Sequence, residues 1–218
     1  MCNLLRYKDR MQQAFAEWEF SDVRIEPKVC HRVPPSAPAP VITVREGRAR
    51  ISMMNFGFST PRGRQMMARG ETVGMLPMFK KAFRQQRCLI LAHGFYDSED
   101  VGRYRQPWHL HLKDDSLMCF AGLWEERPDA ENFTIVSAPA NRVVARVIDR
   151  MPVILPQPLW RSWLIPEARP EELQPMLTSF PPELMEAYPV TRRVNQRGFD
   201  GPECIKPIVP EQGDLGLF

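Results

Sequence analysis

The sequence predicts a single α+β domain with a mostly antiparallel, barrel-like β-sheet core and short flanking helices. Hydrophobic residues make up 44% of the 218 residues and charged residues 25%, a balance typical of globular proteins. The 22 prolines are spread along the chain and divide it into many short elements. No repeat, linker or low-complexity block interrupts it, so we expect one domain over residues 1–218.

In the first half of the chain, hydrophobic periodicity and turn residues predict a helix followed by strands. Met11, Phe15 and Trp18 fall on one face of the first helix. The expected elements are a helix over 8–19, an extended stretch over 33–40, strands over 41–44 and 51–58, a helix over 76–86 and a buried strand over 87–92.

The second half is predicted to begin with a hairpin. Residues 107–112 alternate in polarity, and we expect them to pair with 117–124 across the turn at 114–116. The later expected elements are a strand over 132–137, a helix over 140–147, a strand over 153–155, helices over 159–164 and 171–178, and strands over 189–194 and 205–208.

No stretch of the chain resembles a membrane span or a secretory signal. No apolar run reaches the roughly 18 residues that cross a bilayer, and the first ten residues lack the apolar core of a signal peptide. We therefore expect a cytoplasmic protein without a membrane partner, and a monomer is favoured.

The five cysteines are odd in number and none forms a C-x-x-C pair, which argues against a disulfide scaffold or a zinc ribbon. Cys88 and Cys119 lie in apolar runs and are expected to be buried strand residues. His109 and His111 share one side of a strand, but the sequence offers no third ligand. We predict no metal and no cofactor.

Positive charge is concentrated in residues 45–87, which contain ten basic and two acidic residues. The chain as a whole has 23 Arg among its 29 basic residues, and the planar guanidinium suits phosphate. Aromatic residues are interspersed in the same segment, at Phe56, Phe58, Phe79 and Phe83. Basic charge with stacking rings is typical of single-stranded nucleic-acid grooves. The alternative is a solvated basic face above a core of aromatic residues.

Cys2 is the main candidate for chemistry because removal of Met1 would place its amine and thiol on adjacent carbons. An α-amine has a pKa near 7.7–8.0, so on the order of a tenth is neutral at pH 7. That amine can attack an aldehyde, and the thiol can then close a five-membered thiazolidine ring within the same molecule. The alternative is an unprocessed chain in which Cys2 is incidental.

Several short segments, in order, together resemble the SOS-response-associated peptidase (SRAP) family of abasic-site processing proteins. The chain begins Met-Cys-Asn-Leu where the family begins Met-Cys-Gly-Arg. The resemblance extends from residue 1 to about residue 210. Its further segments are 32–35, 56–58, 67–72, 94–98, 148–152 and 189–195.

The resemblance implies covalent capture of abasic sites in single-stranded DNA. The abasic sugar opens to an aldehyde, and the family's N-terminal Cys, here Cys2, traps it as a thiazolidine. Arg69 matches a phosphate-contacting Arg of the family. Phe56 and Phe58 match the wall beside the lesion. Single-stranded DNA with abasic sites is therefore the expected partner, in the response to DNA damage.

Five positions depart from the family pattern, and two of them replace arginines, one near the start by Leu4 and a phosphate-contacting one by Pro77. The family's Asn is Met67 here, its Glu is Asp97 and its His is Ile148. A catalytic acid or base typically contributes about 10²–10⁴-fold. Asp97 can still relay a proton through water, whereas Ile148 cannot. By their apolarity alone, Met67 and Ile148 would be core residues.

Three functions remain open from the sequence. The first is a crosslink former that captures abasic sites through Cys2, with Asp97 as its remaining proton-transfer group. The second is a non-covalent single-stranded DNA-binding relative in which Cys2 has no catalytic part. The third is a peptidase, as the family name suggests, and it ranks last because no water-activating base accompanies Cys2.

Overall fold

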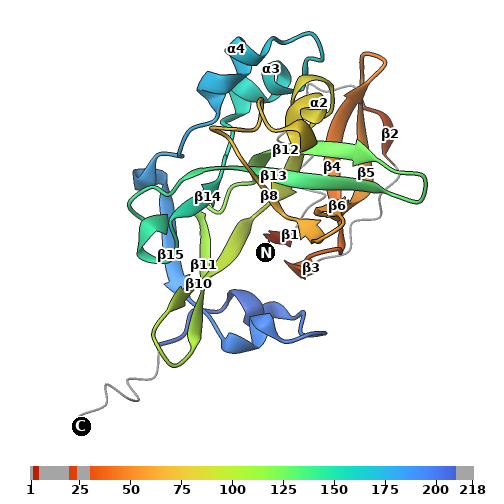
Figure 1. Ribbon diagram of the computed structural model, residues 1–218. Coiled ribbons are helices and arrows are strands. Elements are labelled where there is room, and N and C mark those ends of the chain that lie inside the picture. Colours follow the sequence, from red (N-terminus) through yellow and green to blue (C-terminus); the bar gives the residue numbers. More distant parts are fainter. Residues whose placement is uncertain (1, 5–19, 24–29, 210–218) are drawn as a thin grey trace.

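The computed structural model describes residues 2–4, 20–23 and 30–209. Two β-sheets meet along one side of the molecule, and the helices gather at the far end of the larger sheet (Figure 1). The predicted α+β class with a mostly antiparallel sheet is confirmed. The expected helix over 8–19 lies outside the described residues.

The larger sheet closes on itself to form a barrel-like core. Its path is β14-β13-β12-β9-β4-β5-β2. Strand β13 pairs with β12 on one side and, in parallel, with β5 on the other, which closes the ring β5-β4-β9-β12-β13. The bounds are β2 Phe20–Val23, β4 Pro38–Arg45, β5 Arg48–Phe56, β9 Arg87–Ala92, β12 Met118–Glu126, β13 Glu131–Pro139 and β14 Arg150–Pro152.

At the closing edge, Phe56 and Phe133 stack with ring centroids 5.1 Å apart. The next residue, Gly57, has a φ of 101°, a conformation that side chains other than glycine's rarely adopt. It turns the chain from β5 into a small separate hairpin of β6 (Phe58–Thr60) and β7 (Gly63–Gln65). Strand β8 (Met67–Arg69) then returns beside β13, in parallel. The glycine turn therefore brings β8 to the closing edge.

The smaller sheet has five strands in the order β15-β11-β10-β1-β3. Phe95 of β10 contacts Phe120 of β12 edge-on, at 6.1 Å between ring centroids, so the two sheets share one hydrophobic core. The bounds are β1 Cys2–Leu4, β3 Cys30–Val33, β10 Gly94–Asp100, β11 Arg105–Leu112 and β15 Met185–Pro189.

The outer face of the smaller sheet is covered by the last part of the described chain. Tyr96 packs with Val190, Val194 and Cys204 in a second, small cluster. The Tyr96 hydroxyl donates to the carbonyl oxygen of His31 at 2.8 Å. Val194 and Cys204 lie in two 3₁₀ turns, η5 (Arg192–Asn195) and η6 (Pro202–Ile205).

In the described part of the chain, three short helices lie over the larger sheet: α2 (Pro77–Gln85), α3 (Trp160–Leu164) and α4 (Pro170–Leu173). Buried Arg87 joins two of them to β9, because its guanidinium donates to the carbonyl oxygens of Phe83 and Trp163.

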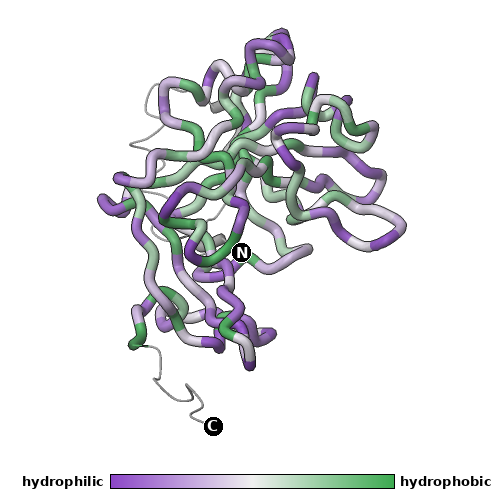
Figure 2. Tube along the Cα trace, turned by 60° about the vertical axis from the view of Figure 1, so that its left-hand side comes forward, coloured by the Kyte–Doolittle hydropathy of each residue, from purple (hydrophilic) through white to green (hydrophobic). Residues whose placement is uncertain are grey.

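Hydrophobic residues concentrate along the central strands, and hydrophilic residues at the loops (Figure 2). Among the described helices, none is long and apolar enough to cross a membrane. The remaining 3₁₀ turns are η1 Val144–Arg146, η2 Gln157–Leu159, η3 Gln174–Met176 and η4 Pro182–Leu184.

The strand at 87–92 and the burial of Cys88 and Cys119 are as predicted. The prediction of a hairpin between residues 107–112 and 117–124 is wrong. Strand β11 pairs with β10 and β15, whereas β12 belongs to the other sheet and pairs with β9 and β13. Residues 140–147 form only a 3₁₀ turn, and 192–195 form another instead of a strand. Several short strands were not predicted, and two of them, β8 and β10, carry residues of the candidate site.

Candidate functional site

A small pocket of about 130 Å³ lies where the two sheets meet. Its apolar lining combines residues of both sheets with the connections between them. Pro35, Phe56, Met66, Met67, Phe95, Ile135 and Pro152 supply it. Asp97 and Arg150 supply charge. The volume corresponds to about four water molecules at the density of the liquid, which restricts the pocket to a small group such as a sugar fragment.

The backbone of Cys2 lies between two strands that border this pocket. Cys2 is the register partner of Phe95 in β10 and of Val33 in β3. Phe95 lines the pocket, and β3 leads to Pro35, which also lines it. Register partners stand directly opposite each other across a sheet. The smaller sheet therefore places residue 2 at the border of the pocket.

Three residues predicted for the site line this pocket together: Phe56, Met67 and Asp97. They come from β5, β8 and β10, which are far apart in the sequence. Asp97 is half-buried, and its Oδ1 accepts a hydrogen bond from the Ser98 amide at 2.8 Å. No described residue hydrogen-bonds its second carboxylate oxygen, which can therefore accept a hydrogen bond from an occupant of the pocket.

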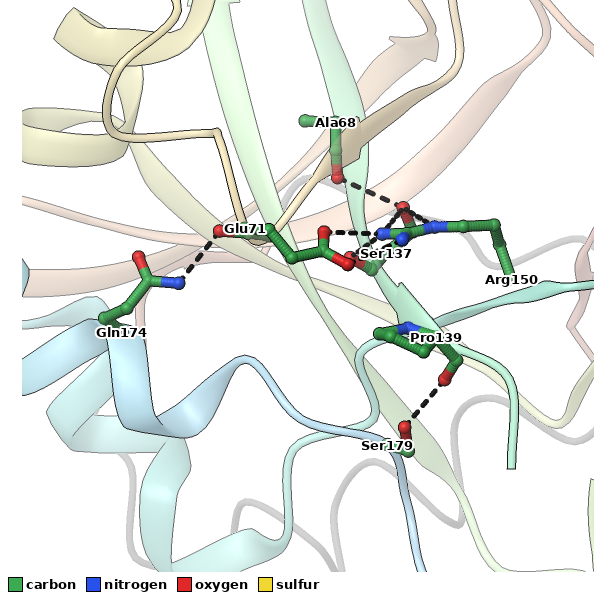
Figure 3. A network of polar contacts seen from close by, with 8 residues as sticks. Ala68, Glu71, Ser137, Pro139, Arg150, Gln174 and Ser179 are labelled. Atoms are coloured by element: carbon green, nitrogen blue, oxygen red, sulfur yellow. Dashed lines mark hydrogen bonds and ion pairs between the residues drawn. The ribbon is translucent and has the colours of Figure 1, made fainter. Parts of the chain in front are cut away.

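Arg150 is a pocket residue that the sequence analysis did not select. Its guanidinium donates to both carboxylate oxygens of Glu71, at 2.6 and 2.9 Å (Figure 3). It also donates to the carbonyl oxygen of Ser137 at 2.7 Å. Hydrogen bonding to Arg150 is the main reason that the pKa of Glu71 falls to about 2. A bidentate ion pair of this kind fixes the orientation of the guanidinium plane.

Arg69 lies at the end of β8, beside the Glu71–Arg150 pair, and is exposed. The following amide, of Gly70, donates to the carbonyl oxygen of Ser137 at 2.8 Å. The side chain of Gln174 donates to the Gly70 carbonyl oxygen at 2.9 Å (Figure 3). The amide and the carbonyl oxygen of Gly70 are thus both hydrogen-bonded. The backbone beside Arg69 is therefore fixed in position near the pocket.

Two other predicted site residues do not line this pocket. Phe58 is only 2% exposed and packs against Phe79, with ring centroids 5.8 Å apart. It borders a different hollow, next to α2. Ile148 is half-buried and packs against the main core, and its amide donates to the Val144 carbonyl oxygen at 3.0 Å. Both residues therefore contribute to the core in this structure.

His109 and His111 stack on each other on the smaller sheet, with ring centroids 5.0 Å apart. His109 Nδ1 lies 3.0 Å from the Tyr188 hydroxyl. Burial lowers the pKa of His109 to about 3, and the neighbouring His111 and His93 add to the effect. Within the described part of the chain, no group of three or more His, Cys, Asp or Glu side chains is arranged to hold a metal ion.

Comparison with known families matches residues 1–197 to the model described as SOS response associated peptidase (SRAP). The chain belongs to the SRAP family. The resemblance read from the short segments is therefore confirmed for the family as a whole. The match includes β1, β10 and the other strands that border the pocket.

Several SRAP relatives are named abasic site processing proteins. YoqW of Bacillus subtilis is 34% identical over 146 residues, which are 64% of this chain and 65% of YoqW. YedK of Escherichia coli is 28% identical over 147 residues, covering 65% of this chain and 66% of YedK. HMCES of Gallus gallus is 28% identical over 183 residues, covering 72% and 52%. The chain thus spans just under two thirds of YoqW.

Solved structures with the same fold extend over nearly the whole chain. A protein from Bacteroides thetaiotaomicron superimposes with a TM-score of 0.74 at 20% identity, covering 92% of this chain and 96% of that one. A phage-related protein from Bordetella bronchiseptica gives a TM-score of 0.71 at 20% identity, covering 88% and 93%. At this identity the likeness shows the fold alone.

Proposed function

We propose that this SRAP protein binds single-stranded DNA and captures abasic sites covalently through Cys2, after removal of Met1. The observation that carries the proposal is the register pairing of Cys2 with Phe95, a residue that lines the pocket shared by Asp97 and Arg150. The names of YoqW and HMCES, abasic site processing proteins, point to the same class of lesion.

The proposed reaction is a condensation. The neutral α-amine of Cys2 attacks the aldehyde carbon of the opened sugar, and water leaves to give an imine. The thiol sulfur then adds to the imine carbon, its proton passes to the nitrogen, and a thiazolidine forms. The second step is intramolecular and gains a large effective molarity. The two reactants release one water molecule to solvent and need no oxidant or cofactor.

Asp97 is the proposed proton-transfer group. It is half-buried at the pocket, with one carboxylate oxygen engaged by the Ser98 amide. A carboxylate can take the proton that the amine loses on attack and return it to the departing hydroxyl. The apolar lining around it, including Met67 and Phe56, offers no second such group. We therefore expect capture to be slow.

Arg150 and Arg69 are the proposed contacts for the DNA phosphates that flank the lesion. Arg150 reaches the pocket and Arg69 is exposed beside it. Glu71 neutralises part of the Arg150 charge, so Arg69 is the stronger attractor of phosphate. Phe56 lines the pocket where the missing base leaves room, whereas Phe58 supports α2 through Phe79.

The deciding experiment is a denaturing gel of the full chain after incubation with an abasic single-stranded oligonucleotide. We expect a shifted band whose intact mass equals protein without Met1 plus DNA minus one water. Cys2→Ala should abolish it. Cys30→Ala is the matched control, because Cys30 is another cysteine of the same sheet and burial raises the pKa of its thiol.

A non-covalent DNA-binding function is the second candidate, favoured by the apolar lining at Met67. It predicts binding to single strands without a shifted band, equally in the wild type and in Cys2→Ala. Retention of Met1 in the purified chain would contradict the thiazolidine route and leave this second function.

A further inference from the structure

A second pocket, of about 320 Å³, lies near the other end of the barrel strands β4 and β5. Its polar lining comes from Thr43 and Arg45 of β4, Arg50 and Ser52 of β5, and Glu131 at the start of β13. Arg50 and Phe56 are six residues apart on one strand, or about 20 Å at the usual rise. The second pocket is therefore separate from the pocket beside Cys2.

Buried polar atoms without a partner gather in this pocket. Among the described residues, the buried atoms that lack a hydrogen-bond partner include Thr43 Oγ1, Arg45 Nε, Arg50 Nε and Ser52 Oγ. Thr43 is 0% exposed, yet it lines the pocket. Proteins rarely leave buried polar groups unsatisfied, and a cluster of them calls for water, an ion or a ligand as their partner.

The unpaired atoms share one chemistry: they are hydrogen-bond donors. A guanidinium Nε only donates, and a hydroxyl can donate as well as accept. The register pairs Thr43 with Arg50, and Val41 with Ser52, so Thr43, Arg50 and Ser52 lie on one face of the two strands. Four such groups on residues that line one space suit an occupant rich in acceptor oxygens.

The two arginines are held in different ways. Arg45 is fixed, because its guanidinium stacks on Trp124 at 4.1 Å and pairs with Glu131. Arg50 is held loosely by Glu46 at 3.4 Å, and the Glu46 side chain is 86% exposed. An exposed pair of this kind is weak. The charged lining residues, Arg45, Arg50 and Glu131, sum to one positive charge, and exposed Glu46 offsets part of it through its pair with Arg50.

We propose that this pocket binds a phosphate monoester group. Such a group carries about −1.5 to −2 charges at pH 7 and presents three strong acceptor oxygens, which matches the convergent donors better than the two free oxygens of a phosphodiester. Arginine suits phosphate through its planar array of donors. The volume of 320 Å³ leaves room for a small group attached to the phosphate.

Two sources present the same chemistry: a small phosphorylated metabolite and the terminal phosphate of a nucleic-acid strand. Titration of the full chain with deoxyadenosine monophosphate, and with deoxyadenosine as its phosphate-free match, tests the first. Short oligonucleotides with and without a 5′-phosphate test the second. Binding in either pair that depends on the phosphate supports the site and identifies the source.

The variants separate this pocket from general attraction of anions. Arg50→Gln should weaken binding of inorganic phosphate and of the monophosphate by about 10- to 100-fold, the range for a hydrogen bond to a charged group. Arg48→Gln is the matched control, because Arg48 is exposed on the same strand and outside the pocket, and it should leave binding unchanged.

Substitutions that remove the unpaired hydroxyls give a second, independent readout. Thr43→Val keeps the shape of the side chain and removes its hydroxyl, so it should raise the melting temperature without phosphate and reduce the rise that phosphate causes. Ser52→Ala should act in the same direction and serves if Thr43→Val disturbs the barrel.

Two results would overturn the proposal. One is the absence of any phosphate effect on melting or in calorimetry at millimolar concentration and constant ionic strength. The other is an equal effect in the wild type, Arg48→Gln, Arg50→Gln and Ser52→Ala, which would show a general ionic response and not a site.

Discussion

Glu71 and Arg150 form a two-pronged ion pair across 79 residues of sequence, with N–O distances of 2.6 and 2.9 Å. The pair connects the segment after β8 to β14, and the guanidinium also donates to Ser137 of β13. Three strands that border the Cys2 pocket are thereby held together at one point. Glu71 thus determines where the charge of Arg150 can act.

Glu71→Gln should remove the ion pair with Arg150, lower the free energy of unfolding at neutral pH and make that free energy depend less on pH under acidic conditions. The folded pKa of Glu71 is about 2 and its ordinary value is 4.5, so its stabilisation is complete above pH 4.5 and is lost as the pH falls toward 2. The Glu71 side chain is 49% exposed, which limits the contribution to about 1 kcal/mol.

Urea unfolding at neutral pH and near pH 3 measures this effect. The loss on Glu71→Gln should be full at neutral pH and clearly smaller near pH 3, where the unfolded chain but not the folded protein has mostly protonated this carboxylate. Glu183→Gln is a suitable control, because it is an exposed glutamate away from the pocket. A loss that is equal at both pH values would contradict the ionic role of Glu71.

Arg69→Ala should weaken binding to single-stranded DNA and reduce its dependence on salt. Each phosphate contact contributes a slope of about −0.7 to the logarithm of the affinity against the logarithm of the salt concentration for single strands. Loss of one contact should therefore reduce the slope by up to about that amount. Fluorescence anisotropy over a range of salt concentrations measures it.

Arg62→Ala tests whether the effect of Arg69 is specific. Arg62 is equally an exposed arginine of the basic segment, but it lies in the turn between β6 and β7, away from the pocket. We expect a smaller change in affinity and slope. Equal changes in the two variants would place the DNA on the basic surface in general.

His109 should make the folded protein less stable as the pH falls. The pKa of His109 is about 3 in the folded protein, whereas the ordinary pKa of histidine is 6.5. Between these pH values, His109 is protonated in the unfolded chain but stays neutral in the folded protein. Stability should decrease by about 1.4 kcal/mol per pH unit from this group while the pH lies between these values. The surrounding groups are His93, His111 and Tyr188, with Asp115 and Glu186 beside His111.

The measurement is the free energy of unfolding between pH 7 and pH 4 for the wild type and His109→Gln. The variant keeps a polar group toward Tyr188 and loses the titration, so its curve should be flatter. A wild-type curve as flat as that of the variant would show that His109 takes up its proton in the folded state as well.

The sequence predicted the elements whose signals are local. The helix at 76–86 was recognisable because Phe79, Ala82 and Phe83 recur at helical spacing, and they are the buried residues of α2. The buried strand at 87–92 was recognisable as a continuous apolar run. Both depend on a few neighbouring residues and not on the rest of the fold.

Strand pairing was not predictable in the same way. The alternation at 107–112 identified a strand, but its partners β10 and β15 lie on separate parts of the chain, and the turn at 114–116 suggested the wrong partner. Arg150 was missed for a related reason, because its partner Glu71 is remote in sequence. Residues predicted from a family motif, such as Phe58, can keep their place in the chain while their side chain packs elsewhere.

The side chain of Met67 makes the pocket less polar than the family pattern implies. Met67 and Asp97 line the pocket together, so an amide at position 67 would stand near the carboxylate and the reacting sugar. Met67→Asn should therefore raise the rate of crosslinking to an abasic strand, by about tenfold for one added hydrogen bond in the transition state. The same amide should cost about 1–3 kcal/mol of stability if it finds no partner in the free protein.

Single-turnover crosslinking, resolved on denaturing gels, distinguishes the possibilities. Met67→Leu is the control of similar volume and should give no gain. Ile148→His should change the rate little by itself, because Ile148 packs against the core and does not line the pocket. If Met67→Asn leaves a Cys2-dependent rate unchanged, residue 67 takes no part in the reaction. If the native chain forms no crosslink while the Met67→Asn, Ile148→His double variant does, the native protein is a binding module, and Asp97 alone does not support the reaction.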